Sequence, residues 1–152
     1  MTLSFDPSGD QWEIRQLVER YAQAVDRADP AGVAALFAPD GVLEVWMDPK
    51  LDEPTAVRTG RADIETAIGG ITRYRATHHT IASSLAQING DQATGETRCV
   101  AHHIYDDGDE VRDRVLYIRY VEQFARIEAR WQFTRREFRV QWRARHSVVE
   151  SV

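Results

Sequence analysis

The sequence predicts a single α+β domain over residues 1–152, with helices in its first half and a curled antiparallel sheet in its second half. Apolar residues recur at three- and four-residue steps over residues 10–28, which is the spacing of an amphipathic helix. From Thr77 onward the pattern has a period of two, which is typical of strands. Turn residues at 89–91 (Asn-Gly-Asp) and 106–109 (Asp-Asp-Gly-Asp) divide this region into long strands. No repeat, low-complexity segment or linker interrupts the chain, so helices packed on one sheet are expected.

The first predicted helix ends with a carboxylate on its apolar side. Asp10 is its expected N-cap, and its apolar stripe consists of Ile14, Leu17, Val18, Tyr21, Ala22 and Val25. Asp26 continues the ridge of Val18 and Ala22 by one more step of four, so its side chain should face the core. The C-terminal end of a helix disfavours negative charge, and a buried aspartate needs partners. Asp26 is therefore a candidate functional residue.

Asp29 and Pro30 predict that a second helix begins directly after the first. Asp29 is expected as its N-cap and Pro30 at its first helical position. This helix should run through Phe37, and the turn residues at 39–41 (Pro-Asp-Gly) should end it.

A first strand is expected at residues 42–47, where Val42, Glu44 and Trp46 alternate with Leu43, Val45 and Met47. A polar loop over 48–60 and a third helix over 61–74, weakened by two glycines, should follow it. The remaining strands are predicted at 77–88, 92–105, 110–124 and 130–145.

Composition and charge argue against several classes of protein. The net charge of −5 disfavours a nucleic-acid backbone as the main partner. No apolar run approaches the roughly 20 residues that cross a bilayer, and the N-terminus lacks the features of a secretory signal. Cys99 is the single cysteine, so we expect it to act as a small buried residue in a reducing, cytoplasmic compartment.

Alternation along the later strands separates inward from outward histidines. Positions 79, 81, 83 and 85 are more apolar than positions 78, 80, 82 and 84, so His79 should point inward and His78 outward. On the next strand His103 shares a face with small and apolar groups, which makes it the inward candidate and His102 the outward one. An inward aspartate and an inward histidine can form a general-base dyad, or a buried pair with only a structural role.

Several of these residues, together with the order of the elements, carry a family resemblance. Tyr21 and Asp26 have a Tyr-x-x-x-x-Asp spacing, His79 lies in a Thr-His-His-Thr-Ile segment, and Trp46 and His103 lie on predicted strands. The chain resembles the SnoaL-like branch of the nuclear transport factor two superfamily, with scytalone dehydratase, the bile acid dehydratases and hexachlorocyclohexane dehydrochlorinase among its members. The resemblance covers nearly the whole chain. It implies a cone-shaped α+β barrel, in which three N-terminal helices pack in a curled, mixed or antiparallel sheet around one deep pocket.

The resemblance also implies roles for these residues. His79 would be the general base, and Asp26 would orient its imidazole. Tyr21 and His103 would hydrogen-bond a developing oxyanion or protonate a leaving hydroxyl, and Trp46 would form part of the pocket wall.

No metal and no other cofactor is expected. Asp26, His79 and His103 are of the types that bind metals, but their spacing is not that of a ligand motif, and the relatives with this pattern work without metal. The sequence has no glycine-rich phosphate loop, nucleophile elbow or dinucleotide fingerprint. One departure from scytalone dehydratase is that Arg114 and Leu116 stand where that enzyme has a polar pair.

The leading hypothesis is a cofactor-independent lyase or isomerase, similar to a dehydratase. It would remove a proton from a small, largely apolar polyketide, steroid or terpenoid held in a deep pocket. A polyketide cyclase with the same dyad and a non-catalytic ligand-binding or partner-subunit module remain open as alternatives. Arginines and glutamates interleave on the last strands, which indicates a solvated or subunit-facing surface. The resemblance implies a homo-oligomer, either a dimer or a trimer.

Overall fold

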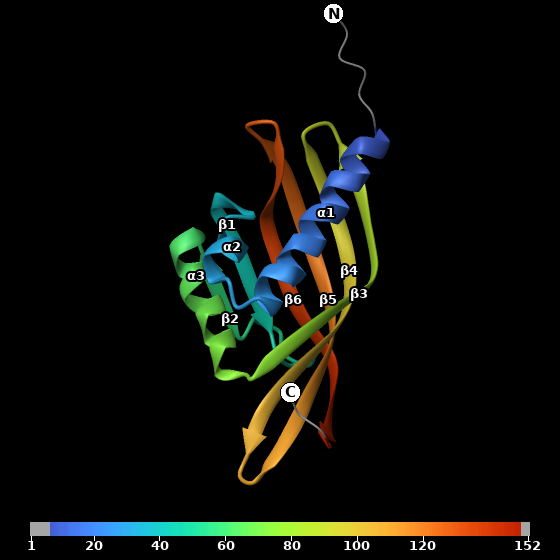
Figure 1. Cartoon of the computed structure of the whole chain (residues 1–152). Coiled ribbons are helices and arrows are strands. Elements are labelled where there is room, and N and C mark those ends of the chain that lie inside the picture. The colour runs from blue at the N-terminus through green and yellow to red at the C-terminus, as the bar shows by residue number, and fades with distance from the viewer. Residues whose placement is uncertain (1–6, 150–152) are drawn as a thin grey trace, which may run out of the picture.

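The computed structural model describes residues 7–149, which form one sheet with helices against one of its faces (Figure 1). The helices are α1 (Pro7–Asp26), α2 (Pro30–Ala34), α3 (Arg61–Ile68) and the 3₁₀ helix η1 (Gly69–Arg73). The strands are β1 (Phe37–Trp46), β2 (Ala56–Thr59), β3 (Ala76–Asn89), β4 (Gln92–Asp107), β5 (Glu110–Ile127) and β6 (Arg130–Ser147). No helix in this part of the chain is both long enough and apolar enough to cross a membrane.

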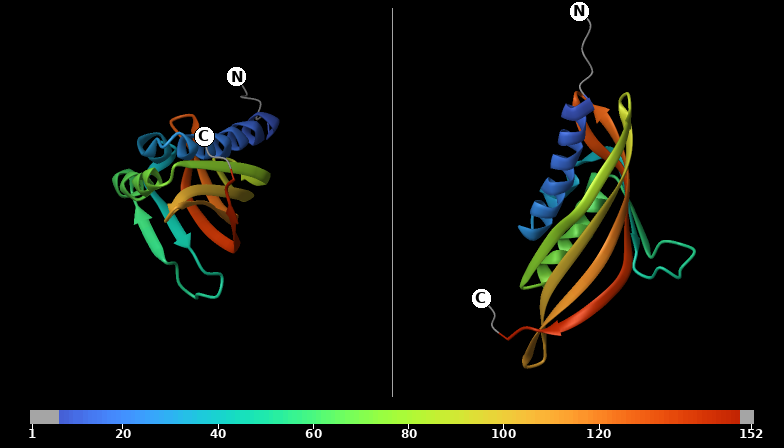
Figure 2. Two further views of the ribbon diagram at one scale, coloured as in Figure 1. Left: turned by 60° about the horizontal axis from the view of Figure 1, so that its bottom comes forward. Right: turned by 90° about the vertical axis from the view of Figure 1, so that its right-hand side faces the viewer.

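The six strands form a mixed sheet in the order β2-β1-β6-β5-β4-β3. Strands β1 and β6 are parallel, and all other neighbours are antiparallel. The α+β class and the mixed sheet are therefore confirmed. The curled sheet does not close into the expected barrel, because β2 and β3 are free edges (Figure 2). The expectation of three N-terminal helices is not confirmed either, since α3 follows β1 and β2 in the chain.

The first strand begins at Phe37 instead of Val42, because the Pro-Asp-Gly turn lies inside it. Strand β1 pairs with β6 on both sides of this turn, and the register shifts between Phe37 and Val42. The turn is therefore a bulge within a strand, and helix α2 ends before it at Ala34. Strand β2, which pairs with β1, was not predicted, because it is short and lies in a polar segment rich in proline. The loop between β1 and β2 projects from the side of the sheet opposite α1 (Figure 2).

The N-terminal end of α1 is fixed differently from what the sequence indicates, whereas the start of α2 is as predicted. Asp10 is not the N-cap, since α1 begins earlier. Its carboxylate instead accepts hydrogen bonds from Arg126 Nη2 at 2.8 Å and Trp131 Nε1 at 2.9 Å, which ties the helix to the β5–β6 hairpin. Asp29 caps α2 as predicted, because its Oδ1 accepts a hydrogen bond from the backbone N–H of Gly32 at 2.9 Å.

A buried arginine lies between α1 and the sheet. The guanidinium carbon of Arg136 is 4.0 Å from the ring centroid of Tyr21, 3.7 Å from that of Tyr120 and 4.7 Å from that of Phe133. Its Nε and Nη2 atoms lie 3.1 Å and 2.9 Å from Glu122 Oε1. Neither charged side chain reaches solvent, so each compensates the other in a medium where an unpaired charge is costly. Aromatic faces add a further attraction for the cation.

Arg136→Ala should destabilise the fold by about 3–5 kcal/mol, because it leaves the Glu122 carboxylate buried without its cation. Urea unfolding measures this difference. The matched control is Arg15→Ala, which breaks an exposed ion pair with Glu19 and should cost no more than about 0.5 kcal/mol. Equal effects of the two substitutions would show that the buried pair does not stabilise the fold.

Candidate active site

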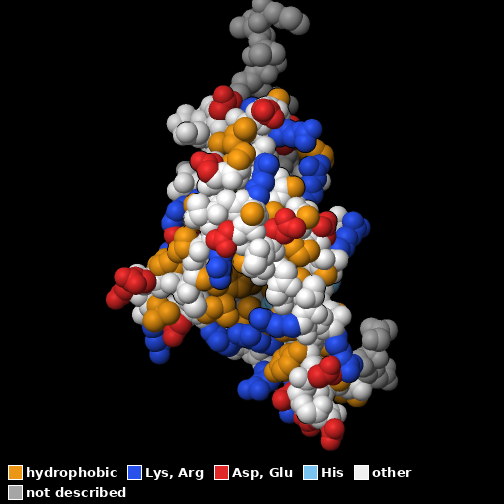
Figure 3. Space-filling view, turned by 90° about the vertical axis from the view of Figure 1, so that its left-hand side faces the viewer, with side chains coloured by type: hydrophobic (Ala, Val, Ile, Leu, Met, Phe, Trp, Pro, Cys, Tyr) orange, Lys and Arg blue, Asp and Glu red, His pale blue; other side chains and the backbone are white. Residues whose placement is uncertain are grey.

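A cavity of about 200 Å³ lies between the C-terminal end of α1, the α3–η1 segment and the inner face of the sheet. Most of its lining is aliphatic or aromatic. The polar side chains in its lining are Tyr21, Arg73, Tyr74, His79, His103, Arg114 and Tyr120. In Figure 3 a hollow with hydrophobic side chains at its floor is open to solvent, and basic side chains gather along its lower edge. The cavity can therefore hold an apolar molecule next to a few polar groups.

Asp26, the last residue of α1, is bonded to His79 of β3. Its Oδ1 lies 2.6 Å from His79 Nδ1 and accepts a hydrogen bond from Thr77 Oγ1 at 2.9 Å. Its Oδ2 accepts a hydrogen bond from the backbone N–H of His79 at 2.9 Å. Burial acts to raise the pKa of Asp26, but the hydrogen bonds from His79 and Thr77 outweigh it and hold this pKa below its ordinary value. The carboxylate favours the proton on Nδ1 of a neutral His79, which leaves a lone pair on Nε2.

His103 of β4 lies beside His79, with 5.7 Å between the ring centroids. Its Nδ1 donates to the backbone carbonyl of Arg114 at 3.1 Å, so Nε2 of the neutral ring is an acceptor. Burial, together with the nearby His79 and Arg114, lowers the pKa of His103 to about 4. At neutral pH His103 is therefore uncharged. Its Nε2 can accept a hydrogen bond from a ligand but has no proton to give.

Tyr21 lines the same cavity from α1. Its ring makes edge contacts with Tyr120 and Phe133, and Arg136 covers one face. Burial raises the pKa of Tyr21, so its phenol stays protonated and can act as a hydrogen-bond donor.

Trp46 does not line this cavity, which corrects its expected place in the wall. Its Nε1 donates to Glu44 Oε2 at 3.0 Å, and the guanidinium carbon of Arg139 lies 4.0 Å from its ring centroid. The wall at β1 is instead formed by the alternate residues Leu43, Val45 and Met47. The alternation in the sequence indicates this inward face, because positions 43, 45 and 47 are all apolar whereas positions 42, 44 and 46 include Glu44.

The structure adds polar residues to the cavity that had no assigned role. Tyr74, directly after η1, lies with its ring centroid 4.8 Å from that of His103. Arg73 Nη2 donates to the hydroxyl of Tyr74 at 3.1 Å. Arg114 reaches the cavity from β5, beside His103. The sequence pattern of 61–74 gave no inward face for Tyr74, because the end of that segment is a 3₁₀ turn and not an α-helix.

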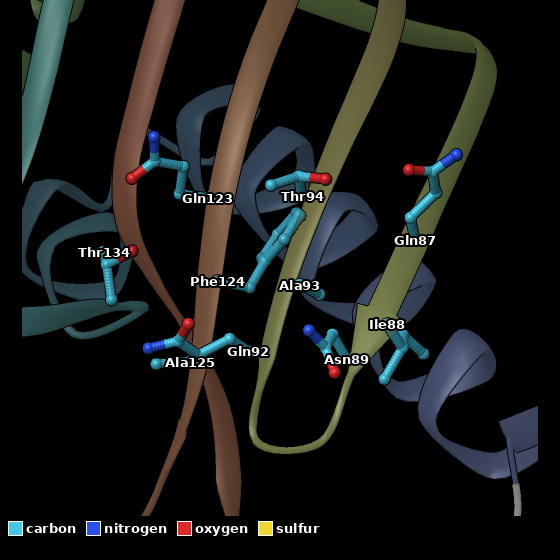
Figure 4. A pocket seen from close by; sticks show the side chains of 10 residues that line it. All are labelled: Gln87, Ile88, Asn89, Gln92, Ala93, Thr94, Gln123, Phe124, Ala125 and Thr134. Atoms are coloured by element: carbon cyan, nitrogen blue, oxygen red, sulfur yellow. The ribbon is translucent and has the colours of Figure 1, made fainter.

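Other parts of the described structure are weaker candidates for a catalytic site. A hollow of about 520 Å³ on the side of the sheet opposite α1 is lined by amide, threonine and apolar side chains, with no ionisable group (Figure 4). Burial raises the pKa of the Cys99 thiol to about 12, so it is not a thiolate nucleophile at neutral pH. Between residues 7 and 149, no group of three or more His, Cys, Asp or Glu side chains is arranged to hold a metal ion.

Comparisons with known proteins agree with this architecture. Residues 7–137 match the family model of the SnoaL-like domain. A proposed scytalone dehydratase from Novosphingobium aromaticivorans has a similar structure, with 24% identity, a TM-score of 0.75, and coverage of 90% of this chain and 87% of that one. A hexachlorocyclohexane dehydrochlorinase of type 2 is 11% identical, with a TM-score of 0.80 and coverage of 95% and 94%. A type 3 dehydrochlorinase from Novosphingobium barchaimii is 13% identical, with a TM-score of 0.79 and coverage of 95% of both chains. These likenesses show a shared fold, and a search among curated proteins finds no match to the sequence.

His103 should remain uncharged until the pH approaches about 4. Because its pKa is lower in the folded than in the unfolded state, it contributes stability above about pH 6.5 that is lost as the pH falls through 4. The wild type should thus lose roughly 3 kcal/mol more than His103→Asn between pH 7 and pH 4. NMR titration of the ring and urea unfolding at both pH values measure the two effects. A His103 ring that titrates at or above pH 6.5 would contradict this environment.

Proposed function

The chain belongs to the SnoaL-like domain family, and from the geometry of its cavity we propose that it is a cofactor-independent lyase or isomerase. It would remove a proton from a small, largely apolar molecule such as a polyketide, steroid or terpenoid. The observation that carries this proposal is the contact of 2.6 Å between Asp26 Oδ1 and His79 Nδ1 beside an apolar cavity. An imidazole fixed in this way has an unprotonated Nε2, which is what a general base requires. The structural neighbours named as a dehydratase and as dehydrochlorinases support an elimination.

In the proposed reaction, His79 Nε2 takes a proton from a carbon atom next to an electron-withdrawing group. The Asp26 carboxylate stabilises the imidazolium that forms. The electron pair of the broken C–H bond then forms a double bond and expels a leaving group such as hydroxide. In an isomerase, the same proton would return to a different carbon.

Tyr21 and His103 have different proposed roles, one as a hydrogen-bond donor and the other as an acceptor. The protonated phenol of Tyr21 donates a hydrogen bond to a developing oxyanion or to the leaving oxygen, where negative charge gathers. His103 accepts a hydrogen bond from a substrate hydroxyl through Nε2 and so orients the substrate. The environment of His103 thus supports a positioning role over that of an acid.

The size of the cavity limits the part of the substrate that it encloses. Its volume of about 200 Å³ lies below the roughly 300–1,000 Å³ of pockets that bury drug-sized ligands. The reacting end of a polyketide or terpenoid would enter the cavity. The rest would lie in a wider hollow of about 780 Å³ at its mouth, which shares Arg73, Tyr74 and Arg114 with the cavity.

The base can be tested with nitrobenzisoxazole, whose ring opens to a coloured phenolate when a base removes its C–H proton. The wild type should accelerate this ring opening, and His79→Ala should lower the rate about a hundredfold or more. Asp26→Asn should also slow it, because the imidazole loses its orienting carboxylate. Absorbance of the phenolate measures the rate.

The matched control is His78→Ala, which removes the exposed imidazole of the neighbouring residue. Its rate should equal that of the wild type. If His79→Ala and His78→Ala have the same rate, His79 is not the base, and a non-catalytic binding module becomes the better account.

We also propose that the chain works in the cytoplasm as a homo-oligomer, a dimer or a trimer. The free, buried thiol of Cys99 supports a reducing compartment. On the outer face of the sheet, the rings of Tyr117 and Trp142 stack at 4.6 Å, and Trp142 is 58% exposed. Large exposed aromatic side chains are enriched where subunits meet.

Trp142→Glu should convert the oligomer to a monomer, because it places a charge in the centre of the proposed interface. Sedimentation velocity measures the assembly state. Trp12→Glu alters another exposed tryptophan, on α1, and should leave the assembly unchanged. A monomeric wild type, or a Trp142→Glu variant that still assembles, would contradict the proposed interface.

A further inference from the structure

Four arginines gather at the mouth of the cavity. Arg73, Arg114, Arg143 and Arg145 line a hollow of about 780 Å³ that shares Arg73, Tyr74 and Arg114 with the cavity. Asp106 is the acidic side chain among the described residues that line this hollow, and its carboxylate is 2.6 Å from Arg75 Nη2. The mouth is therefore strongly basic, although the chain as a whole has a net charge of −5.

Two of these arginines lie directly opposite each other on neighbouring strands. In the sheet register His103 of β4 pairs with Arg114 of β5, and Arg114 pairs with Arg145 of β6. Side chains of directly paired residues project from the same face, so this row leads from the cavity to its mouth. Like charges in such a pair destabilise a sheet unless an opposite charge lies between them. His103 adds no third positive charge to this row at neutral pH, because its ring is neutral there, but it cannot supply the negative charge.

Several arginines elsewhere on the same strands have acidic partners. On the outer face Arg135 pairs with Glu44, Arg139 with Glu137 and Arg119 with Glu96. Within residues 7–149, no carboxylate forms an ion pair with Arg73, Arg114, Arg143 or Arg145. Arg143 instead donates to the backbone carbonyl of Met47, and Arg73 to Tyr74. Four basic groups without a carboxylate partner thus converge on the mouth of one cavity, from η1, β5 and β6.

We propose that the substrate carries an anionic group, a carboxylate or a phosphate, that binds Arg114 and Arg145 while its apolar part fills the cavity. The guanidinium fork can donate two parallel hydrogen bonds to either kind of oxyanion, and the anion relieves the repulsion between the two cations. Arg73 and Arg143 lie at the same hollow and add positive potential. That the bound molecule is a substrate rests on the proposed function, whereas anion binding at the mouth does not depend on catalysis.

The test uses three naphthalene probes that share one apolar body: naphthoate, naphthyl phosphate and the neutral naphthalenemethanol. Isothermal titration calorimetry compares their binding to the wild type, to the double variant Arg114→Gln/Arg145→Gln, and to Arg139→Gln as a control on the outer face. The wild type should bind at least one anion about tenfold or more tightly than naphthalenemethanol. The double variant should lose this preference and bind naphthalenemethanol as the wild type does, whereas Arg139→Gln should keep it. The tighter of the two anions identifies the acid group as carboxylate or phosphate.

Equal binding of the anions and naphthalenemethanol by the wild type would overturn the proposal. So would an anion preference that survives in the double variant, or an absence of binding by both anions at millimolar concentration. Unchanged binding of naphthalenemethanol shows that the double variant is folded with its cavity intact. His79→Ala, carried through the same titrations, separates this inference from the proposed function. If His79→Ala keeps the anion preference while the wild type does not accelerate the ring opening of nitrobenzisoxazole, the anion site stands and the catalytic proposal fails.

Discussion

The carboxylate of Asp26 joins the end of α1 to the beginning of β3, and the shape of the cavity depends on this junction. β3 is an edge strand with a single neighbour, β4, so part of its backbone has no partner strand. Asp26 bonds to this part of the edge strand. One carboxylate oxygen accepts a hydrogen bond from the backbone N–H of His79, and the other contacts the Thr77 hydroxyl and Nδ1 of the His79 ring. These donors offset the unfavourable position of a negative charge at a helix C-terminus. One carboxylate therefore holds the helix, the edge strand and the orientation of the imidazole together.

Polarity changes in steps from the core to the mouth of the cavity. In the core, the charge of Arg136 is fully compensated by Glu122 and covered by aromatic rings. Next come two side chains that are uncharged at neutral pH, the phenol of Tyr21 and the imidazole of His103. At the mouth, arginines such as Arg114 and Arg145 have no acidic partner among the described residues. This gradient suits a molecule with an apolar reacting end and a charged far end.

Local patterns predicted the elements and the inward residues wherever a single period governs a segment. The stripe of α1 placed Asp26 at its end, and alternation placed His79 inward, because both depend only on the geometry of one element. The catalytic roles of these residues stay predictions. The expected place of Trp46 in the pocket wall followed from the resemblance alone, and Trp46 lies on the same face of β1 as Glu44, to which its indole donates a hydrogen bond.

Other features depend on contacts between segments that are distant in the sequence, and a local sequence pattern cannot predict such contacts. Arg136 has the same local sequence context as the surface arginines around it, and it is buried because Glu122 and three rings meet there. The bulge between Phe37 and Val42 follows from pairing with β6, nearly a hundred residues later in the chain. The juxtaposition of Arg114 and Arg145 likewise follows from the register of β5 and β6. The sequence alone showed only an arginine-rich C-terminal region.

The central claim is that Asp26 sets the tautomer of His79 so that Nε2 faces the cavity as a base. NMR of the imidazole nitrogens, with the His79 signals assigned by comparison with His79→Ala, measures this tautomer directly in the neutral ring. The account predicts a proton on Nδ1 and a lone pair on Nε2 in the wild type, with a weaker preference in Asp26→Asn. A neutral His79 with its proton on Nε2 would contradict the account, because no base would then face the cavity.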